Sequence, residues 1–297
     1  LPASVNTLAD EDLPLFTPRN QILYSNPVNN KNDNPRIFLK SIFKPLKGLE
    51  AVFEYTFDKN IYDYHWYTGQ YDYTTIQGGS SKSFVDDYLR KYKQHTNYNS
   101  INVYATYNKD FGNHHFKVMA GFNQESSYQE TLDTYSYNQA VLDVPAMSSG
   151  TGTIKATDSY SEYAIRGGFF RVNYNYLDKY LAEINFRSDA SSKFGPGNQR
   201  GYFPSISLGW RMSSENFMAD AEKVDDLKLR FSWGQTGSTN INDFVYRQFY
   251  EKGNPYIGQS TLTPGLLPNP DIKWEETAMT NVGIDFMALR NRLTLTA

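Results

Sequence analysis

The chain has 297 residues, a formal net charge of -3 at pH 7 and no cysteine. Without cysteine, this chain has no disulfides, thiolate zinc sites, iron–sulfur clusters or cysteine nucleophile. A charge so near zero argues against a general nucleic-acid binder. Mean hydropathy is -0.61, yet aromatic residues make up 16% of the chain, which argues against disorder. No apolar run approaches the ~18 residues that a membrane helix needs.

Both ends of the sequence look cut. The chain opens at Leu1-Pro2 without an apolar signal segment, and it stops inside an alternating run at Ala297. We therefore expect a fragment of a longer protein, with residues 1–35 as a lead-in of the extracellular-loop type.

Period-two alternation of apolar and polar residues is the main pattern, and it predicts strands. In residues 180–189, for example, Tyr180, Ala182, Ile184 and Phe186 alternate with polar residues. Ten strands are predicted in this way: residues 36–44, 49–58, 98–108, 115–126, 162–176, 180–189, 202–212, 227–234, 276–286 and 292 to the end.

The connections between these strands alternate in length. Short turns are expected at residues 45–48, 109–114, 177–179 and 287–291, and long loops at residues 59–97, 127–161, 190–201 and 235–275, with residues 213–226 intermediate. A transmembrane β-barrel sorts its connections in this way, with short periplasmic turns and long extracellular loops. A soluble antiparallel sheet with one buried face is the alternative, because it gives the same alternation within its strands.

Aromatic residues gather near both ends of the predicted strands, as the interfacial girdles of a barrel require. The two sets are, on the short-turn side, Tyr107, Phe116, Tyr174, Tyr180 and Trp210, and on the long-loop side, Tyr55, Phe57, Phe122, Tyr163, Phe186 and Tyr202. The fold class predicted is thus all-β, an antiparallel transmembrane β-barrel segment of about ten strands.

Four stretches resemble the SusC/RagA family of TonB-linked outer-membrane transporters. The most specific is residues 176–211, which contain the sequence RSDASSKFGPGNQRGYFPSISLGWR. The others are residues 226–237, residues 269–275 (Asn-Pro-Asp-Ile-Lys-Trp-Glu) and residues 281–296, in matching order and spacing. Together they cover roughly the last 120 residues, and the first 160 match only in style.

The resemblance implies part of a barrel of about 22 strands in the outer membrane of a Gram-negative cell. It implies import of oligosaccharides or peptides, a SusD-like surface lipoprotein as a lid, and energy from TonB–ExbB–ExbD acting on an N-terminal plug domain. It also implies that the plug domain and the last strands lie outside residues 1–297. A siderophore or cobalamin receptor of the TonB-dependent class is one alternative, and a secreted soluble glycan-binding or adhesin domain is another.

Ligand contacts are expected in the long loops, where residues 61–73 carry a dense aromatic run. Aromatic faces suit sugar rings and peptide side chains. The alternative is that these rings pack on one another, and that the lumen-facing charges form mutual ion pairs. The candidate ligand-binding residues are Tyr64, Trp66, Tyr67, Tyr71, Arg187 and Asp189.

No catalytic constellation is apparent, so no enzymatic activity is expected. His114-His115 is expected in a solvated turn rather than at a metal, and Ser191 and Ser192 have no histidine nearby in sequence. No cofactor is predicted. Ca²⁺ bound by oxygens of the polar loop cluster 29–34 is an open alternative, although the EF-hand spacing is missing.

Overall fold

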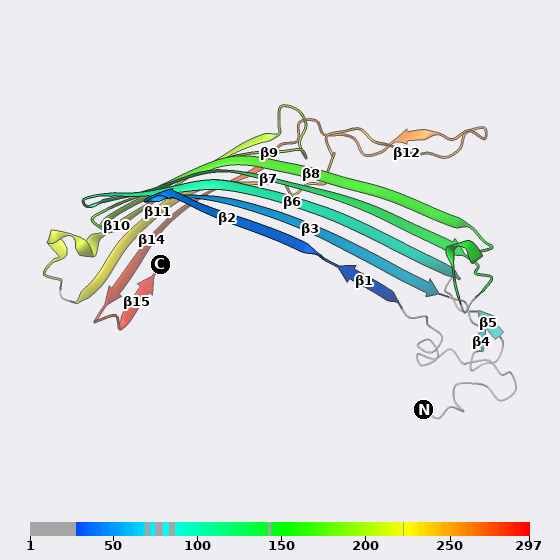
Figure 1. The fold of residues 1–297 in the computed structure, drawn as a ribbon, viewed down its shortest axis with the longest axis horizontal. Coiled ribbons are helices and arrows are strands. Elements are labelled where there is room, and N and C mark those ends of the chain that lie inside the picture. The colour runs from blue at the N-terminus through cyan, green and yellow to red at the C-terminus, as the bar shows by residue number, and fades with distance from the viewer. Residues whose placement is uncertain (1–27, 69–71, 75–79, 83–86, 142–143, 222) are drawn as a thin grey trace, which may run out of the picture. The chain divides into compact units, whose positions relative to one another are not determined.

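The computed structural model describes the chain except for residues 1–27, 69–71, 75–79, 83–86, 142–143 and 222 (Figure 1). No helix among the described residues is long and apolar enough to span a membrane. The strands are β1 (Asn29–Asp33), β2 (Arg36–Leu46), β3 (Leu49–Thr68), β4 (Asp72–Thr74), β5 (Ser80–Lys82), β6 (Tyr88–Phe111), β7 (His114–Tyr137), β8 (Ile154–Tyr176), β9 (Tyr180–Ser191), β10 (Arg200–Arg211), β11 (Val224–Ser238), β12 (Tyr250–Lys252), β13 (Leu262–Pro264), β14 (Glu275–Ala288) and β15 (Leu293–Thr296).

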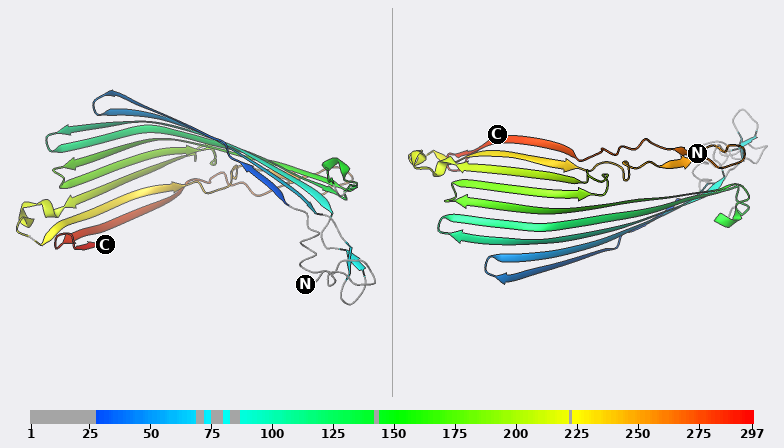
Figure 2. Two further views of the ribbon diagram at one scale, coloured as in Figure 1. Left: turned by 60° about the horizontal axis from the view of Figure 1, so that its bottom comes forward. Right: turned by 90° about the horizontal axis from the view of Figure 1, so that it is seen from above.

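The main sheet has 11 strands in the order β1-β3-β6-β7-β8-β9-β10-β11-β14-β15, with β2 also paired to β3. Successive strands of the chain therefore lie side by side, as both views of Figure 2 show for β8 to β11. The pairs with a recorded register are antiparallel. Each of the ten predicted strands is present, which confirms the all-β antiparallel prediction, and within the described residues the sheet is an open wall.

The chain divides into two compact units. Unit 1 comprises Leu1–Arg36, Asp58–Asn97 and Tyr128–Ser161, and unit 2 comprises Ile37–Phe57, Tyr98–Ser127 and Glu162–Ala297. Strands β2, β3, β6, β7 and β8 contribute residues to both units.

Unit 2 contains a sheet with one apolar and one polar face. Register places Tyr174, Ala182, Leu208, Phe231 and Val282 in one row across five strands, β8, β9, β10, β11 and β14. The neighbouring row on the other face is entirely polar: Asn173, Glu183, Ser207, Ser232 and Asn281. The predicted alternation is therefore confirmed in these five strands: apolar residues neighbour apolar residues on one face, and polar residues neighbour polar residues on the other.

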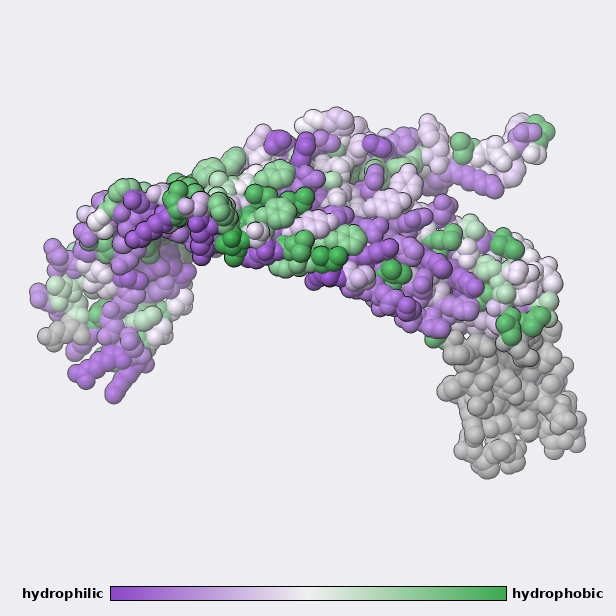
Figure 3. All heavy atoms as spheres, in the orientation of Figure 1, coloured by the Kyte–Doolittle hydropathy of each residue, from purple (hydrophilic) through white to green (hydrophobic). Residues whose placement is uncertain are grey.

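The apolar face of unit 2 is uncovered. Ile184 is 46% exposed, Leu208 45% and Val282 79%, and nothing among the described residues packs over them. Figure 3 shows apolar residues gathering over the region of β2, whose alternate residues Ile37, Leu39 and Phe43 are exposed on one face. An apolar area this continuous is unstable in water and suits hydrocarbon.

Aromatic rings border this apolar face at both ends, as predicted. On the short-turn side Tyr180 lies opposite Trp210, and on the long-loop side the rings of Phe186 and Tyr202 are 6.2 Å apart. From Tyr180 to Ser188, the partner of Tyr202, β9 advances about 26 Å at 3.3 Å per residue. This matches the apolar band of outer-membrane barrels, which is about 25 Å tall.

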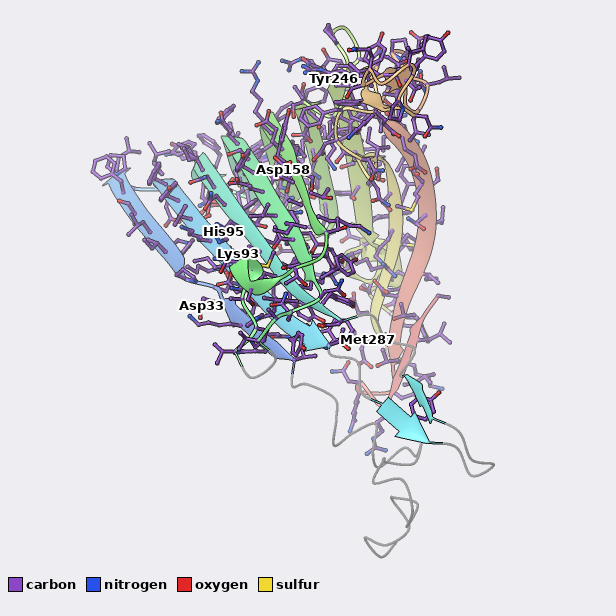
Figure 4. The ribbon with its side chains drawn as sticks, turned by 90° about the vertical axis from the view of Figure 1, so that its right-hand side faces the viewer. Asp33, Lys93, His95, Asp158, Tyr246 and Met287 are labelled. Atoms are coloured by element: carbon purple, nitrogen blue, oxygen red, sulfur yellow. The ribbon has the colours of Figure 1, made fainter. Side chains whose placement is uncertain are left out.

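The strands are longer than predicted where unit 1 was expected to be loop. Residues 59–68 continue β3, residues 88–97 begin β6, and residues 127–137 and 154–161 belong to β7 and β8. In unit 1 the alternate positions of β6 carry Lys91, Lys93 and His95, and Figure 4 shows the last two on this strand. Both faces of β6 in this segment are polar or aromatic, so the sequence lacks the apolar alternation that predicts a strand. For this reason the segment was expected to be a loop.

Residues 29–33, expected in a polar loop, form β1 and pair with β3. Asn60 Nδ2 donates to Asn32 Oδ1 at 3.0 Å, so part of this polar cluster is occupied by contacts within the sheet. Among the described residues no group of three or more His, Asp or Glu is arranged to hold a metal ion. The Ca²⁺ alternative stays untested. The histidine pair begins β7, where His114 Nδ1 lies 2.9 Å from Tyr174 Oη and His115 Nδ1 lies 2.8 Å from Asp110 Oδ1.

The predicted short turns are present. At the β2–β3 turn, Gly48 has a φ of +86°, and an added Cβ would lie 2.4 Å from the Asn108 carbonyl oxygen. Only glycine fits such a left-handed position in so tight a space. The longest connections, residues 69–87, 138–153 and 239–274, join the opposite strand ends, which confirms the sorting for these three. The predicted long loop 190–201 is wrong in length: only residues 192–199 connect β9 and β10, fewer than the 212–223 connection on the short-turn side.

Candidate functional site

Arg90 is the centre of an aromatic cluster in unit 1, hereafter the Arg90 cluster. Its guanidinium carbon lies 5.5 Å from the ring centroid of Tyr64 on β3, 5.6 Å from that of Tyr92 on β6 and 5.2 Å from that of Tyr135 on β7. Attraction between a cation and an aromatic face acts at these distances. Three adjacent strands are thereby joined through one side chain.

Asp133 completes the Arg90 cluster with two parallel hydrogen bonds. Arg90 Nε donates to Oδ1 at 3.0 Å and Nη2 donates to Oδ2 at 2.9 Å. The two side chains are 29% and 22% exposed. These hydrogen bonds raise the pKa of Arg90 above its usual value, so the guanidinium is charged at any working pH.

Further rings extend the Arg90 cluster. Trp66 meets Tyr88 edge to face with centroids 5.6 Å apart, and Tyr88 lies at the same distance from Tyr135 and Tyr137. The predicted site residues Tyr64 and Trp66 are thus brought together, and their rings do pack on neighbours. Both remain partly exposed, so each also offers a surface to a ligand.

Tyr67 is 7% exposed, and on β3 it follows Trp66 directly, so its side chain points to the other face. Burial, together with the Asp87 carboxylate, raises the pKa of the Tyr67 hydroxyl to about 12. Because Tyr67 is buried, its side chain packs within the sheet and is not exposed to a solute. Tyr71 lies outside the described residues.

Arg187 and Asp189 form a separate pair in unit 2. Arg187 Nε donates to Asp189 Oδ2 at 2.6 Å, and the guanidinium carbon lies 5.9 Å from the Phe169 ring centroid. Asp189 is 6% exposed, and its Oδ1 is buried without a hydrogen-bond partner among the described residues. Oδ1 faces Gly167, where an added Cβ would lie 1.7 Å away.

The other charges on the polar face of unit 2 follow the same rule. Arg230 Nε lies 2.8 Å from Asp285 Oδ2, and Arg211 Nε lies 3.4 Å from Asp226 Oδ1. A groove of about 810 Å³ runs over this face, and Lys228, Arg230, Asn281 and Ser207 are among its lining residues. The face is wettable, with its charges mostly neutralised in pairs, as the ion-pair alternative anticipated.

The most specific sequence motif has a structural role. Phe194, Phe203 and Trp274 form a small buried core, with Phe194 fully buried and the other two 8% exposed. Trp274 Nε1 donates to the Gln199 carbonyl at 2.8 Å. Lys193 Nζ donates to the Ile241 carbonyl at 2.9 Å and lies 3.5 Å from Asp243 Oδ1. These contacts hold the 192–199 loop against the 239–274 connection.

Arg90 and Asp133 were not among the residues predicted for the site. Their segments were expected to be loops, so nothing indicated that β3, β6 and β7 would bring them together. One usable indication was the alternation Tyr88, Arg90, Tyr92, which places all three side chains on one face of a strand.

A wall of antiparallel strands, one face apolar and exposed, the other polar, is the construction of a transmembrane β-barrel. Residues 4–297 match the family model described as TonB dependent receptor-like, beta-barrel. The chain belongs to this family, whose members are outer-membrane transporters rather than enzymes.

Individual relatives agree with the motif resemblance. The chain is 35% identical over 208 residues to TonB-dependent receptor SusC of Bacteroides thetaiotaomicron, covering 66% of this chain and 20% of the relative. It is 28% identical over 270 residues to TonB-dependent receptor P3 of Formosa agariphila, covering 89% of this chain and 26% of the relative. The SusC/RagA-type resemblance is confirmed.

A solved structure has the same fold. The RagAB peptide importer in the "open-open" state matches with a TM-score of 0.83 and 20% identity, over 99% of this chain and 32% of that one. The chain thus spans about a fifth to a third of the relatives it matches.

Proposed function

We propose that this chain is part of the wall of an outer-membrane importer that takes up oligosaccharides or peptides. The observation that carries the proposal is the SusC-type sequence on a sheet whose apolar face is exposed and whose polar face is paired and wet. The apolar face contacts lipid, and the polar face borders the route of a large hydrophilic solute.

The partners follow from the same family. A SusD-like lipoprotein covers the long connections, and the similarity to the RagAB peptide importer supports this. TonB–ExbB–ExbD supplies energy through a plug domain. A soluble glycan-binding domain does not fit a family of outer-membrane barrels, and the siderophore or cobalamin alternative serves as the contrary outcome of the test.

Within the chain, the Arg90 cluster is the proposed ligand-contacting surface. Trp66, Tyr88 and Tyr64 offer ring faces and edges for a sugar ring or an apolar peptide side chain. Arg90 is neutralised by Asp133, so it holds the rings in place instead of attracting anions. The structure thereby favours neutral or mixed-charge solutes over strongly anionic ones.

Growth of a deletion strain on a panel of glycans and peptides tests the proposal. Loss of growth on one class, restored by the full-length gene, is the expected result. Restoration with Trp66→Ala should be weaker, whereas Leu289→Ala, at a 52% exposed site in the short turn after β14, should restore growth fully. Normal growth on every polymer, together with a defect only at low iron or cobalamin, would contradict the proposal and favour the alternative receptor class.

A further inference from the structure

Two arginines lie on the apolar side of unit 2 just beyond the aromatic border. Register places Arg166 of β8 opposite Ala190 of β9, and Ala190 opposite Arg200 of β10. Gly168, Ser188 and Tyr202 form the next row on the same face. The two arginines therefore lie one row, about 7 Å along the strands, past the aromatic border on the long-loop side.

Neither guanidinium forms an ion pair with any described residue. Arg166 has no charged partner, and Arg200 only donates from Nη1 to Ser188 Oγ at 3.0 Å. The arginines of the polar face differ in this respect. Each of them has a carboxylate oxygen within 4.0 Å: Arg171, Arg187, Arg211 and Arg230. Glu162 is exposed two rows beyond Arg166 on β8 and forms no ion pair with it.

Only the small side chain of Ala190 lies between the two arginines in their row. Strands lie about 4.8 Å apart, so the two Cα atoms are about 10 Å from each other across Ala190. Beside Arg166, a hollow of about 260 Å³ is lined by Arg166, Ala190, Ser192 and Gln124 of β7 among others, and Arg200 is not one of its lining residues. The Ser192 hydroxyl accepts from the Ala164 amide at 2.9 Å, which leaves its own hydrogen available.

We propose that Arg166 and Arg200 bind the phosphate of a membrane lipid, seated across Ala190. Arginine presents a planar fork of donors that matches phosphate geometry, and two forks converging on one site bind an anion far better than one. The position fixes the source of the phosphate. It continues the lipid-facing apolar surface at the level of the headgroups, so the acyl chains of the same molecule lie along Phe170, Ile184 and Tyr202.

The site is independent of the imported solute, because it lies on the face opposite the paired charges. The inference rests only on the membrane location of the chain. It predicts that the full-length protein retains a phosphorylated glycolipid of the lipid A type in preference to the same glycolipid without phosphate.

Native mass spectrometry of the full-length protein in detergent, titrated with lipid A and with its dephosphorylated form, tests the site. We expect at least about tenfold tighter binding of the phosphorylated form, and loss of that preference in Arg166→Gln/Arg200→Gln. Ala190→Leu keeps both charges but fills the space between them, and it should weaken binding to a similar extent.

Arg171→Gln/Arg230→Gln, which removes the same charge from the polar face, is the matched control and should retain the preference. Equal binding of both glycolipids by the wild type, or an unchanged preference in both the double variant and Ala190→Leu, would overturn the proposal. Saturable binding of inorganic phosphate that displaces none of the lipid would also overturn it, since the ligand would then be a free anion elsewhere.

Discussion

At the scale of single residues, Gly167 shows how closely the polar face is packed. An added Cβ would meet the buried Asp189 Oδ1 at 1.7 Å, a distance that no rotamer adjustment of a paired, buried carboxylate easily relieves. Gly168, next in sequence, faces the other side, and its Cβ would have Gly121 O at 3.9 Å as its nearest atom. A side chain is therefore excluded by a close contact at Gly167, whereas the space around Gly168 would admit one.

Gly167→Ala should lower the level of folded full-length protein in the outer membrane, because the clash separates β8 from β9 or breaks the Arg187–Asp189 pair. A cost of about 1–3 kcal/mol is expected for such overpacking. Gly168→Ala should change the level little. The readout is the amount of heat-modifiable protein in membrane fractions. Equal levels of both variants would show that Asp189 is not held as described.

Glu215 is a second residue whose role depends on its neighbours. It lies between two short 3₁₀ segments after β10, and there Tyr180 Oη donates to Oε1 at 2.6 Å and Trp210 Nε1 donates to the same oxygen at 3.1 Å. The hydrogen bond from Tyr180, then that from Trp210, lowers the pKa of this carboxyl below its usual value. Phe217 of the same connection meets Trp210 edge to face.

Since the folded-state pKa is lowered, the stabilisation from ionised Glu215 is present above the ordinary glutamate pKa and is lost as pH falls through the lowered value. Trp210 fluorescence should therefore be flat from pH 7 to about pH 4.5 and change only below it. Glu215→Gln should remove this acid transition. A transition centred near pH 6 in the wild type would contradict the assignment.

At the scale of elements, the small core of Phe194, Phe203 and Trp274 fixes the position of the 239–274 connection. This explains why two motifs far apart in sequence, around residues 189–205 and 269–275, belong together. The connection itself carries exposed apolar side chains, such as Leu266 and Leu267, so its anchoring comes from this core and from Lys193.

Trp274→Ala should release this connection, because deleting a buried aromatic side chain costs about 3–5 kcal/mol. Limited proteolysis of the full-length protein should then cut within residues 239–273 much faster, while the strands stay protected. Leu267→Ala, at an 87% exposed site, is the control and should leave the cleavage rate unchanged. If Trp274→Ala gives the wild-type pattern, the core does not anchor the connection.

The elements that sequence could predict are those with one apolar face. Residues 180–189 and 202–212 alternate except at Leu181 and Phe203, and their register places the predicted apolar residues on one face. Residues 59–68 and 88–97 were expected to be loop, because Lys91, Lys93 and His95 on one face and tyrosines on the other leave no apolar parity. These segments are nevertheless strands, because β3, β6 and β7 are paired as neighbours in one sheet.

The candidate site followed the same division. Tyr64 and Trp66 were predicted from ring density and do belong to one cluster, but its centre, the Arg90–Asp133 pair, depends on three strands meeting. Contacts of this kind depend on register, and a sequence without strand assignments offers no register. Whether these rings contact a solute stays a prediction.

At the scale of the whole chain, the central claim is that one face of the sheet meets lipid and the other meets water. The low mean hydropathy and the high aromatic content then have a common cause. Apolar residues are confined to alternate positions, whereas the other face, the long connections and unit 1 are polar, and rings border the apolar band.

Site-directed labelling of β10 tests this claim most directly, and the lack of cysteine in this chain makes single substitutions readable. Ser205, Ile206, Ser207 and Leu208 are each replaced by cysteine in the full-length protein in its membrane, and the labelled peptide is identified by mass spectrometry. We predict that a water-soluble maleimide labels positions 205 and 207, and that a lipid-soluble reagent labels positions 206 and 208. Labelling of all four positions alike by the water-soluble reagent would contradict the account.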